Sequence, residues 1–346
     1  MKILVIQLRQ LGDILLTTPV LRELKRLVPG CNITFLSHQM GKLILEDCPF
    51  VDDYFTYGND WSLRQEISLA STLRKRKFDF AFDFMNNPRS ALYALGSLAR
   101  ERVAFRSARW WCYNHLVPRQ GPKQYIVREK FRILESAGFN ANPDHADRLV
   151  LPWFEKDTAP VMRFVGNHPW ASDAPLRIAI SPTHRREVRR WPLERYAALA
   201  DFLARHWGAF VVWQWGPGEE SEIDAVMRMC NETTYKAPKT TFRELAALTA
   251  NVDLFIGNSN GPSHVAVATG TPSLQLHGPT HAWAWCPQTE RHSAIQGEGA
   301  SMSEIGLASV IAKLESMRPM LMAYADNRRA AGMRVHWIHP SPALQR

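Results

Sequence analysis

Short apolar segments alternate with amphipathic helical segments along this chain, and the alternation stops once and then starts again. Residues 2–8 (KILVIQL) are a short β-branched run that ends near a glycine, which predicts a buried strand. Helical spacing of apolar residues follows at 13–28, and further strands are predicted at 32–37 and 78–84. Segments that alternate in this way pair as parallel βαβ units, so the fold class is α/β.

The second half of the chain repeats this organisation after a proline-rich stretch at 140–176. We predict two doubly wound, Rossmann-like domains at 1–155 and 176–318, joined by a linker at 156–175. The tail at 319–346 is a candidate helix that packs back on the N-terminal domain. Ligands bind at the carboxyl ends of the strands in such sheets, so the interdomain cleft is the expected site.

The net charge of +9 and the isoelectric point near 9.5 point to an anionic partner. Nucleic acid, an acidic membrane face and phosphorylated small molecules all fit this charge, and solubility alone is the alternative. The chain has no zinc-finger spacing, no heptad basic region and no aromatic RNA-binding signature. We therefore expect no nucleic-acid partner.

Cysteine usage and hydropathy indicate a cytoplasmic protein. The five widely spaced cysteines contain no CxxC motif, which is typical of a reducing compartment. The N-terminal apolar run of about five residues is too short for a signal-peptide core. No window supplies the roughly 18 apolar residues that span a bilayer. We expect the chain in the cytoplasm, free or peripheral at the inner face of the cytoplasmic membrane.

The first strand-to-helix turn contains Gly12 and Asp13. Gly12 allows another molecule to approach the backbone closely. Asp13 has two interpretations: a helix N-cap, or a carboxylate that faces the cleft and accepts a proton from an acceptor hydroxyl. A helix N-terminus favours the ionised form and so lowers basicity, whereas desolvation in a closing cleft would offset that effect.

A second turn, Ser259-Asn260-Gly261-Pro262-Ser263-His264, lies between a predicted strand and an apolar helix. Small residues ahead of the helix leave backbone N–H groups uncovered, and a helix start of this kind binds diphosphate well. The segment is not a Walker loop. An ordinary strand–turn–helix corner is the alternative, with His264 as a packed or capping histidine.

Two further segments offer groups for a nucleotide. Residues 181–192 contain Thr183 and four arginines, and arginine suits bidentate binding of phosphate. A solvated basic loop is the alternative, although Trp191 and Pro192 indicate an anchored end. Glu219 and Glu220 follow a strand, where a carboxylate can accept from ribose hydroxyls or simply favour a helix start.

Metal chemistry has little support in the sequence. There is no HExxH, no EF-hand loop and no Asp-x-Asp, so we expect no metal and no cofactor. Arginines and helix starts would then neutralise a diphosphate. The RSARWW segment, with Arg106, Arg109, Trp110 and Trp111, is a candidate contact with an acceptor or a membrane surface. An ordinary loop with a buried tryptophan is the alternative.

Three segments together resemble glycosyltransferase family 9, which includes the lipopolysaccharide heptosyltransferases. They are ILVIQLRQLGDILLTTPVLRELK, RRWPLERYAALA and IGNSNGPSHVAVATGTPSLQLHGPT, and they occur in order along nearly the whole chain. The resemblance implies the GT-B architecture, with an acceptor-side N-terminal domain facing a donor-side C-terminal domain. It also implies inverting, metal-independent transfer, with ADP-heptose as the best-known donor.

The resemblance assigns roles to single residues. Asp13 matches the general base proposed for the family, and Arg189 stands where many members have a lysine that stabilises the donor diphosphate. Thr183 matches a hydroxyl near the phosphates. Glu219 or Glu220 matches an acid near the ribose.

The last turn matches the family in part. Gly261 and His264 match the pattern Asp-Ser/Thr-Gly-x-x-His, but Ser259 replaces the acid and Asn260 replaces the hydroxyl. The sequence therefore predicts transfer of a sugar, a heptose from ADP-heptose, onto a phosphorylated glycolipid of the lipopolysaccharide core or a related glycan. A nucleotide-sugar-binding protein with another donor, or without transferase activity, is the alternative that the change at Ser259 leaves open.

Overall fold

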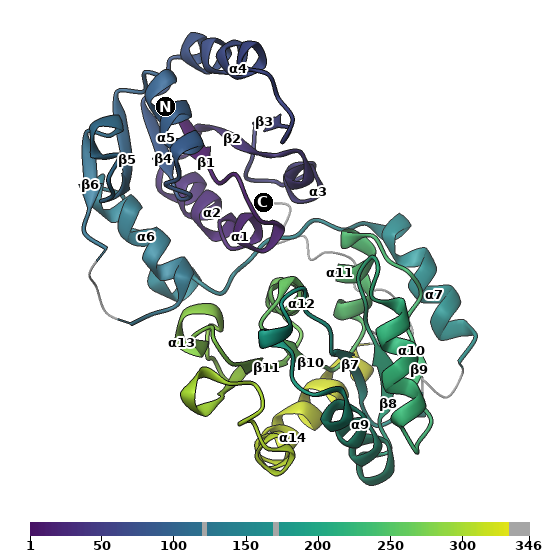
Figure 1. Cartoon of the computed structure of the whole chain (residues 1–346). Helices are drawn as coiled ribbons and strands as arrows, with labels where there is room; N and C mark the ends of the chain where they lie inside the picture. Colours follow the sequence, from purple (N-terminus) through teal and green to yellow (C-terminus); the bar gives the residue numbers. More distant parts are fainter. Residues whose placement is uncertain (120–122, 169–172, 332–346) are drawn as a thin grey trace. The chain divides into compact units, whose positions relative to one another are not determined.

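The computed structural model describes residues 1–119, 123–168 and 173–331, which form two units. The first unit comprises residues 1–152, and the second begins at Trp153. Each unit contains a six-stranded sheet of parallel strands with helices packed against it (Figure 1). The predicted α/β class, with two Rossmann-like domains, is confirmed.

The first sheet has the strand order β3-β2-β1-β4-β5-β6. Its strands are β1 (Lys2–Ile6), β2 (Asn32–His38), β3 (Asp53–Tyr57), β4 (Phe80–Asp83), β5 (Glu101–Phe105) and β6 (His115–Val117). The central strand β1 pairs with β2 on one side and β4 on the other. A strand covered on both faces must be apolar, which explains the run ILVI that follows the exposed Lys2.

The helices of the first unit form pairs beside this sheet. α2 lies beside α6, and α4 lies beside α5 (Figure 1). The helices are α1 (Leu11–Leu15), α2 (Thr18–Leu27), α3 (Lys42–Leu45), α4 (Leu63–Arg76), α5 (Pro88–Gly96) and α6 (Ile126–Ser136). The single helix predicted at 13–28 is in fact α1 and α2, with Pro19 in the first turn of α2, where its missing N–H costs least.

The second sheet repeats the pattern with the order β12-β11-β10-β7-β8-β9. Its strands are β7 (Arg177–Ser181), β8 (Phe210–Trp213), β9 (Tyr235–Lys236), β10 (Leu254–Asn258), β11 (Ser273–His277) and β12 (His292–Gln296). The helices are α7 (Ala159–Gly166), α9 (Leu193–Trp207), α10 (Glu220–Met229), α11 (Phe242–Ala250), α12 (Gly261–Thr269), α13 (Ala282–Trp285) and α14 (Leu307–Ala330).

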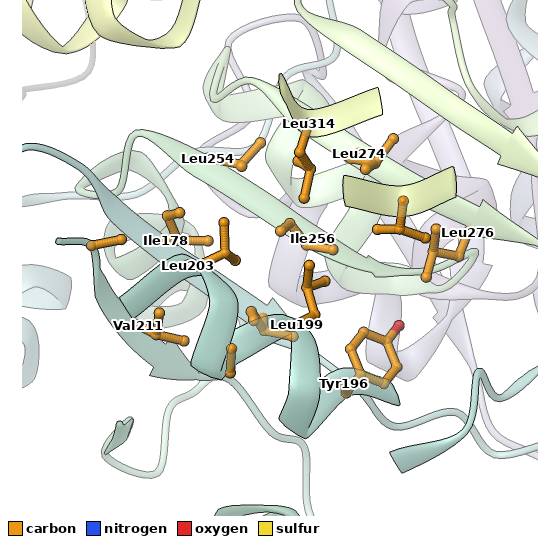
Figure 2. Close-up of a cluster of buried hydrophobic side chains, with 14 of the residues drawn as sticks. Ile178, Tyr196, Leu199, Leu203, Val211, Leu254, Ile256, Leu274, Leu276 and Leu314 are labelled. Carbon is orange, nitrogen blue, oxygen red and sulfur yellow. The ribbon is translucent and has the colours of Figure 1, made fainter. Parts of the chain in front are cut away.

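Aliphatic side chains from the sheet and two helices form the core of the second unit (Figure 2). Ile178 of β7 and Ile256 of β10 meet Leu199 and Leu203 of α9 and Leu314 of α14, and all five are fully buried. Full burial of each such side chain contributes roughly 1.5–3 kcal/mol. This packing fixes β7 and β10 side by side, and the turns discussed below follow these two strands.

The predicted linker and tail both contain regular structure. Part of the segment at 156–175 forms α7, which packs against α11 of the second unit. Residues 319–331 lie in α14, where Arg328 donates to the carbonyls of Ala250 and Val252 at 2.8 and 2.5 Å. This described part of the tail packs on the second unit, whereas we expected the tail to pack on the first. Residues 332–346 lie outside the described residues.

All five cysteine thiols are free. None of the helices within residues 1–119, 123–168 and 173–331 is long and apolar enough to cross a membrane.

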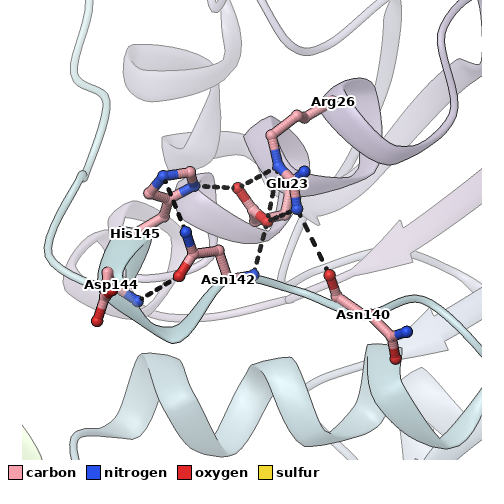
Figure 3. Close-up of polar contacts among 6 residues, drawn as sticks. All are labelled: Glu23, Arg26, Asn140, Asn142, Asp144 and His145. Atoms are coloured by element: carbon pink, nitrogen blue, oxygen red, sulfur yellow. Dashed lines mark hydrogen bonds and ion pairs between the residues drawn. The ribbon is translucent and has the colours of Figure 1, made fainter.

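A buried carboxylate ties α2 to the end of the first unit (Figure 3). The Glu23 side chain is fully buried and accepts from Arg26 Nη2 at 2.7 Å, His145 Nδ1 at 2.6 Å and the Asn142 N–H at 2.9 Å. Burial alone would raise the pKa of Glu23, but these hydrogen bonds outweigh it and lower the pKa to about 2. Glu23 therefore stays ionised in the fold and holds the segment at 140–145 against α2.

The Glu23 cluster predicts a specific loss of stability in acid. Because the pKa of Glu23 is about 2 in the fold and near 4.5 when exposed, the unfolded chain binds more protons between these values. The contribution, about 3 kcal/mol, is fully present above pH 4.5 and is lost as the pH falls towards 2. Urea unfolding of Glu23→Gln between pH 3 and 7 should show lower stability at pH 7 and a flatter decline below pH 4.5.

The exposed residue Glu46, paired with Lys42 at 3.4 Å, offers the matched control Glu46→Gln. We expect this control to follow the wild type at every pH. Parallel acid profiles for Glu23→Gln and the wild type would contradict the role assigned to the cluster.

Candidate functional site

The turn after β1 holds Asp13 in the first helical turn of α1. Gln10 is the N-cap residue, and its N–H donates to Asp13 Oδ2 at 3.0 Å in a capping box. The interpretation of Asp13 as the N-cap is therefore wrong, because Asp13 occupies the third helical position. Its other oxygen, Oδ1, receives no hydrogen bond from the described residues. The capping box thus fixes one carboxylate oxygen of Asp13.

A lysine that the sequence analysis missed lies directly behind this turn. Lys130 of α6 is only 5% exposed, and its Nζ donates to Gln7 Oε1 at 3.0 Å, Thr17 Oγ1 at 2.7 Å and the Asp13 carbonyl at 3.3 Å. Burial lowers the pKa of Lys130 to about 8, and the charge of Asp13 partly opposes that shift. The available signal was its position: Lys130 falls between the buried residues Val127 and Phe131 on the apolar side of α6.

The loop after β5 is held by a buried carboxylate at the end of β4. Asp83 accepts from Tyr113 Oη at 2.6 Å and from the Asn86 N–H at 2.8 Å, and burial raises the pKa of Asp83. Arg109 Nη2 donates to the Asn86 carbonyl at 2.6 Å. These contacts fix the base of the RSARWW segment.

Trp110 and Trp111, at the tip of the RSARWW segment, are 63% and 53% exposed. The alternative of a buried tryptophan is therefore wrong. Arg106, earlier in the same segment, is also exposed.

In the second unit, three of the segments selected from the sequence meet at the carboxyl ends of β7, β8 and β10. Thr183 Oγ1 donates to Glu219 Oε2 at 2.6 Å, and the Gly216 N–H donates to the same oxygen at 2.8 Å. Asn260 Nδ2 donates to the Thr183 carbonyl at 3.1 Å. The strand order places β7 between β8 and β10, which brings these distant segments together.

The start of α12 retains the geometry of an anion site. Asn260 is the N-cap: its Oδ1 accepts from the Ser263 N–H at 3.3 Å, and Ser263 Oγ donates to the Asn260 carbonyl at 2.7 Å. Apart from its chain neighbours and the backbone of its own helix, no described atom lies within 4 Å of the place where a Cβ on Gly261 would stand, so space is open beside it. Asn260 therefore caps the helix with its side-chain oxygen. Ser259 is buried and leaves the turn without the acidic charge.

His264 is a packed, neutral histidine. It is 5% exposed, and burial lowers its pKa to about 4, with a further contribution from His277. Its ring lies 6.1 Å from the Trp285 ring. The structure thus favours the alternative of a packed histidine, and its neutral ring brings no positive charge to the start of α12.

The structure assigns different environments to two neighbouring arginines. Arg190 donates to the His184 carbonyl at 2.5 Å and to Glu222 at 2.6 Å. The next residue, Trp191, is fully buried and donates through Nε1 to the Ile305 carbonyl at 2.8 Å. Arg189 is half-buried, and its guanidinium makes no hydrogen bond or ion pair with the residues that the structure describes. The anchored loop therefore holds Arg189 with its donors available.

The two candidate acids also differ. Glu220 is exposed and pairs with Lys236 at 2.9 Å, whereas Glu219 lies against Thr183 with its Oε1 unbonded by any described residue. A hollow of about 500 Å³ opens beside Glu220, lined by Trp215, Pro217, Gly218, Glu220, Ser221, Asp224 and Lys239. Among the described residues, no group of three His, Cys, Asp or Glu side chains is arranged to hold a metal ion.

Comparison with known proteins gives a consistent result. The model of glycosyltransferase family 9 (heptosyltransferase) matches residues 67–310, more than half of the chain. The chain is 29% identical to lipopolysaccharide heptosyltransferase 3 of Escherichia coli K12 over 298 residues, covering 82% of this chain and 84% of the relative. It is 23% identical to the lipopolysaccharide core heptosyltransferase OpsX of Haemophilus influenzae over 281 residues, covering 79% and 78%.

Solved structures share the fold. A family 9 glycosyl transferase from Veillonella parvula superposes with a TM-score of 0.78 at 22% identity, covering 91% of this chain and 96% of that one. The E. coli heptosyltransferase WaaC, solved with ADP, superposes with a TM-score of 0.71 at 18% identity, covering 92% and 100%. These likenesses agree with the predicted GT-B fold.

The different environments of Arg189 and Arg190 predict different roles in anion binding. Pyrophosphate should raise the melting temperature of the wild type, and Arg189→Ala should weaken its binding about tenfold, because one charge-assisted contact is lost. Without pyrophosphate, the melting temperature of Arg189→Ala should match that of the wild type. Thermal shift and calorimetric titration measure both effects.

Arg190→Ala is the matched control. It loses the contacts to His184 and Glu222, so the free protein should melt a few degrees lower. If Arg189→Ala binds pyrophosphate as tightly as the wild type, Arg189 has no role in anion binding.

Proposed function

Because this chain belongs to glycosyltransferase family 9, we propose that it transfers a heptose from ADP-heptose onto a lipopolysaccharide core or related glycan acceptor. The transfer inverts the anomeric configuration and uses no metal ion. Curated relatives named as lipopolysaccharide heptosyltransferases support the sugar class, and the neighbour solved with ADP supports the nucleotide.

The observation that carries the proposal is the state of the Asp13 carboxylate. One oxygen accepts from the Gln10 N–H, and the other accepts no hydrogen bond from the described residues. In the proposed reaction Asp13 Oδ1 takes the proton from the acceptor hydroxyl. The acceptor oxygen forms a bond to the anomeric carbon of the donor while the bond from that carbon to the diphosphate breaks. The product is the glycoside with inverted configuration, and ADP departs with the electron pair.

Groups of the second unit stabilise the charge that develops on the departing diphosphate. The N–H groups at the start of α12 are supported by the Asn260 cap, and the space beside Gly261 is open for phosphate oxygens. Arg189 adds a guanidinium with available donors, whereas the Thr183 hydroxyl already donates to Glu219 and holds that carboxylate in place. A neutral Ser259 removes one negative charge from this neighbourhood, which favours rather than opposes an anion. These groups take the place of a metal ion in this proposal.

The nucleoside part of ADP occupies the side of the cluster where Glu219 lies. Glu219 Oε1 is free to accept from ribose hydroxyls, while Glu220 is already paired with Lys236. We therefore assign the ribose contact to Glu219. Trp215, whose Nε1 donates to the Ala237 carbonyl at 2.8 Å, lines the hollow beside Glu220.

The acceptor is proposed to contact the RSARWW segment. Its exposed cation, Arg106, suits phosphate groups of a glycolipid, and Trp110 and Trp111 suit the interface between lipid headgroups and acyl chains. The segment would therefore hold the enzyme at an anionic membrane face, where the acceptor is presented.

Replacement of Asp13 tests the central step. Asp13→Asn keeps the capping geometry but cannot accept the proton, so kcat should fall by roughly 10²–10⁴-fold. ADP affinity should stay within about twofold, because the nucleotide contacts lie in the second unit. ADP release is measured with ADP-heptose and a Kdo-bearing acceptor.

Asp144→Asn, which changes an exposed acid of the same unit, should behave as the wild type. Unchanged turnover in Asp13→Asn would reduce Asp13 to a capping residue. Tight ADP-heptose binding by the wild type, with no ADP release in the presence of acceptor, would instead favour a binding protein without transferase activity.

Trp110→Ser combined with Trp111→Ser tests the acceptor surface. We expect at least a tenfold loss of binding to vesicles that contain anionic lipid, because two interfacial indole rings are removed. Co-sedimentation measures the bound fraction. Leu63→Ser, which removes another exposed apolar side chain of the first unit, should bind like the wild type. Equal vesicle binding by all three proteins would exclude the tryptophans from the contact.

A further inference from the structure

Lys130 is a cation placed in the core of the first unit. α6 turns it inward between Val127 and Phe131, and only 5% of the residue is exposed. Its Nζ lies 5.4 Å from the centre of the Phe84 ring. No carboxylate oxygen lies within ion-pair distance of Nζ in the part of the chain that the structure describes. Burial of an ammonium without a paired carboxylate costs folding free energy, which points to a functional role for Lys130.

The three hydrogen bonds of Lys130 all go to the segment that carries Asp13. Gln7 lies at the end of β1, and its side-chain amide, which accepts from Lys130, donates onward to the Arg9 carbonyl at 2.5 Å. Thr17 lies at the junction of α1 and α2 and donates to the Asp13 carbonyl at 2.7 Å. The ammonium therefore connects the segment on both sides of Asp13.

Lys130 also replaces a backbone bond that this turn lacks. The Thr17 N–H would bond the Asp13 carbonyl in a continuous helix, but it bonds the Ile14 carbonyl instead, at 2.9 Å. The Asp13 carbonyl accepts instead from Lys130 Nζ and Thr17 Oγ1. The break between α1 and α2 is thus bridged by side chains, with Lys130 providing the charged donor.

We propose that Lys130 is a positioning residue for Asp13, whose ammonium holds the turn so that the Asp13 carboxylate meets the acceptor hydroxyl. The inference rests on the proposed function of Asp13 as the proton acceptor. Lys130 itself touches neither substrate.

The protonation state of Lys130 gives this role a pH dependence. An ammonium has three donors for its three acceptors, whereas the neutral amine has two, so one contact is lost above a pH of about 8. Of the groups facing Nζ, Gln7, Thr17 and Phe84 are neutral. The Asp13 charge acts on Lys130 from α1, while two charged residues of α6, Glu129 and Arg132, pair with each other at 2.7 Å and a third, Arg128, is exposed. Turnover should therefore decline through pH 8.

Lys130→Met and Lys130→Arg test this role kinetically. We expect kcat to fall on the order of 10²-fold in Lys130→Met, with KM for ADP-heptose within about twofold, because a displaced base affects chemistry rather than donor binding. Neither variant titrates near pH 8, so the decline above that pH should be absent from both. Arg128→Met removes an exposed cation from the same helix and should keep the wild-type profile. A purely structural lysine would change the melting temperature and leave the profile intact, which would overturn the proposal.

A titration that needs no turnover separates this inference from the proposed function. In protein labelled with ¹³C-lysine, the Lys130 Cε resonance should titrate near pH 8 in the wild type and at lower pH in Asp13→Asn, because a favourable charge is removed. Asp144→Asn should leave it unchanged. An identical titration in Asp13→Asn and the wild type would overturn the electrostatic coupling between Lys130 and Asp13. A wild type that shows the coupling but transfers no heptose would overturn the proposed function alone.

Discussion

In a parallel sheet every strand ends at the same edge, and the candidate site of this chain depends on that constraint. Thr183, Glu219 and Asn260 follow three different strands. Glu219 and Asn260 lie 36 and 77 positions after Thr183, yet both form hydrogen bonds with it. The buried contacts of β7 and β10 with α9 and α14 set the positions of those strand ends. The turn with Asp13 follows the central strand of the first sheet in the same way. Apolar packing away from the candidate site therefore sets the positions of its residues.

In both units, neighbouring charged residues differ in whether another side chain pairs with them. Arg190 and Trp191 anchor a basic loop, which leaves Arg189 unpaired among the described residues. Glu220 is neutralised by Lys236, which leaves Glu219 beside Thr183. In the first unit, Lys130 is buried with neutral acceptors so that the Asp13 turn is held from behind. In each case one residue is bonded within the fold, whereas its neighbour keeps polar atoms that no described residue bonds.

The sequence predicted the strands that are buried on both faces, because continuous apolar runs such as β1 and β10 carry a strong pattern. It missed five strands that are largely half-buried or only two or three residues long, namely β3, β5, β6, β9 and β12. It selected turns that the structure brings together at the ends of the strands. Periodicity could not distinguish Arg189 from Arg190 or Glu219 from Glu220, since neighbouring residues differ only in tertiary partners. Lys130 was missed because a lysine on a helix normally faces solvent, and only the fold shows that this one does not.

The anomeric configuration of the product tests the account most directly. The donor is ADP-heptose of known configuration, the reaction contains a metal chelator, and the new glycosidic linkage is assigned by NMR. A single attack by an acceptor hydroxyl deprotonated at Asp13 predicts a product of inverted configuration and turnover that survives the chelator. Retained configuration would require a second displacement, and chelator-sensitive turnover would require a metal ion. Either result would contradict the mechanism built on Asp13, Arg189 and the start of α12.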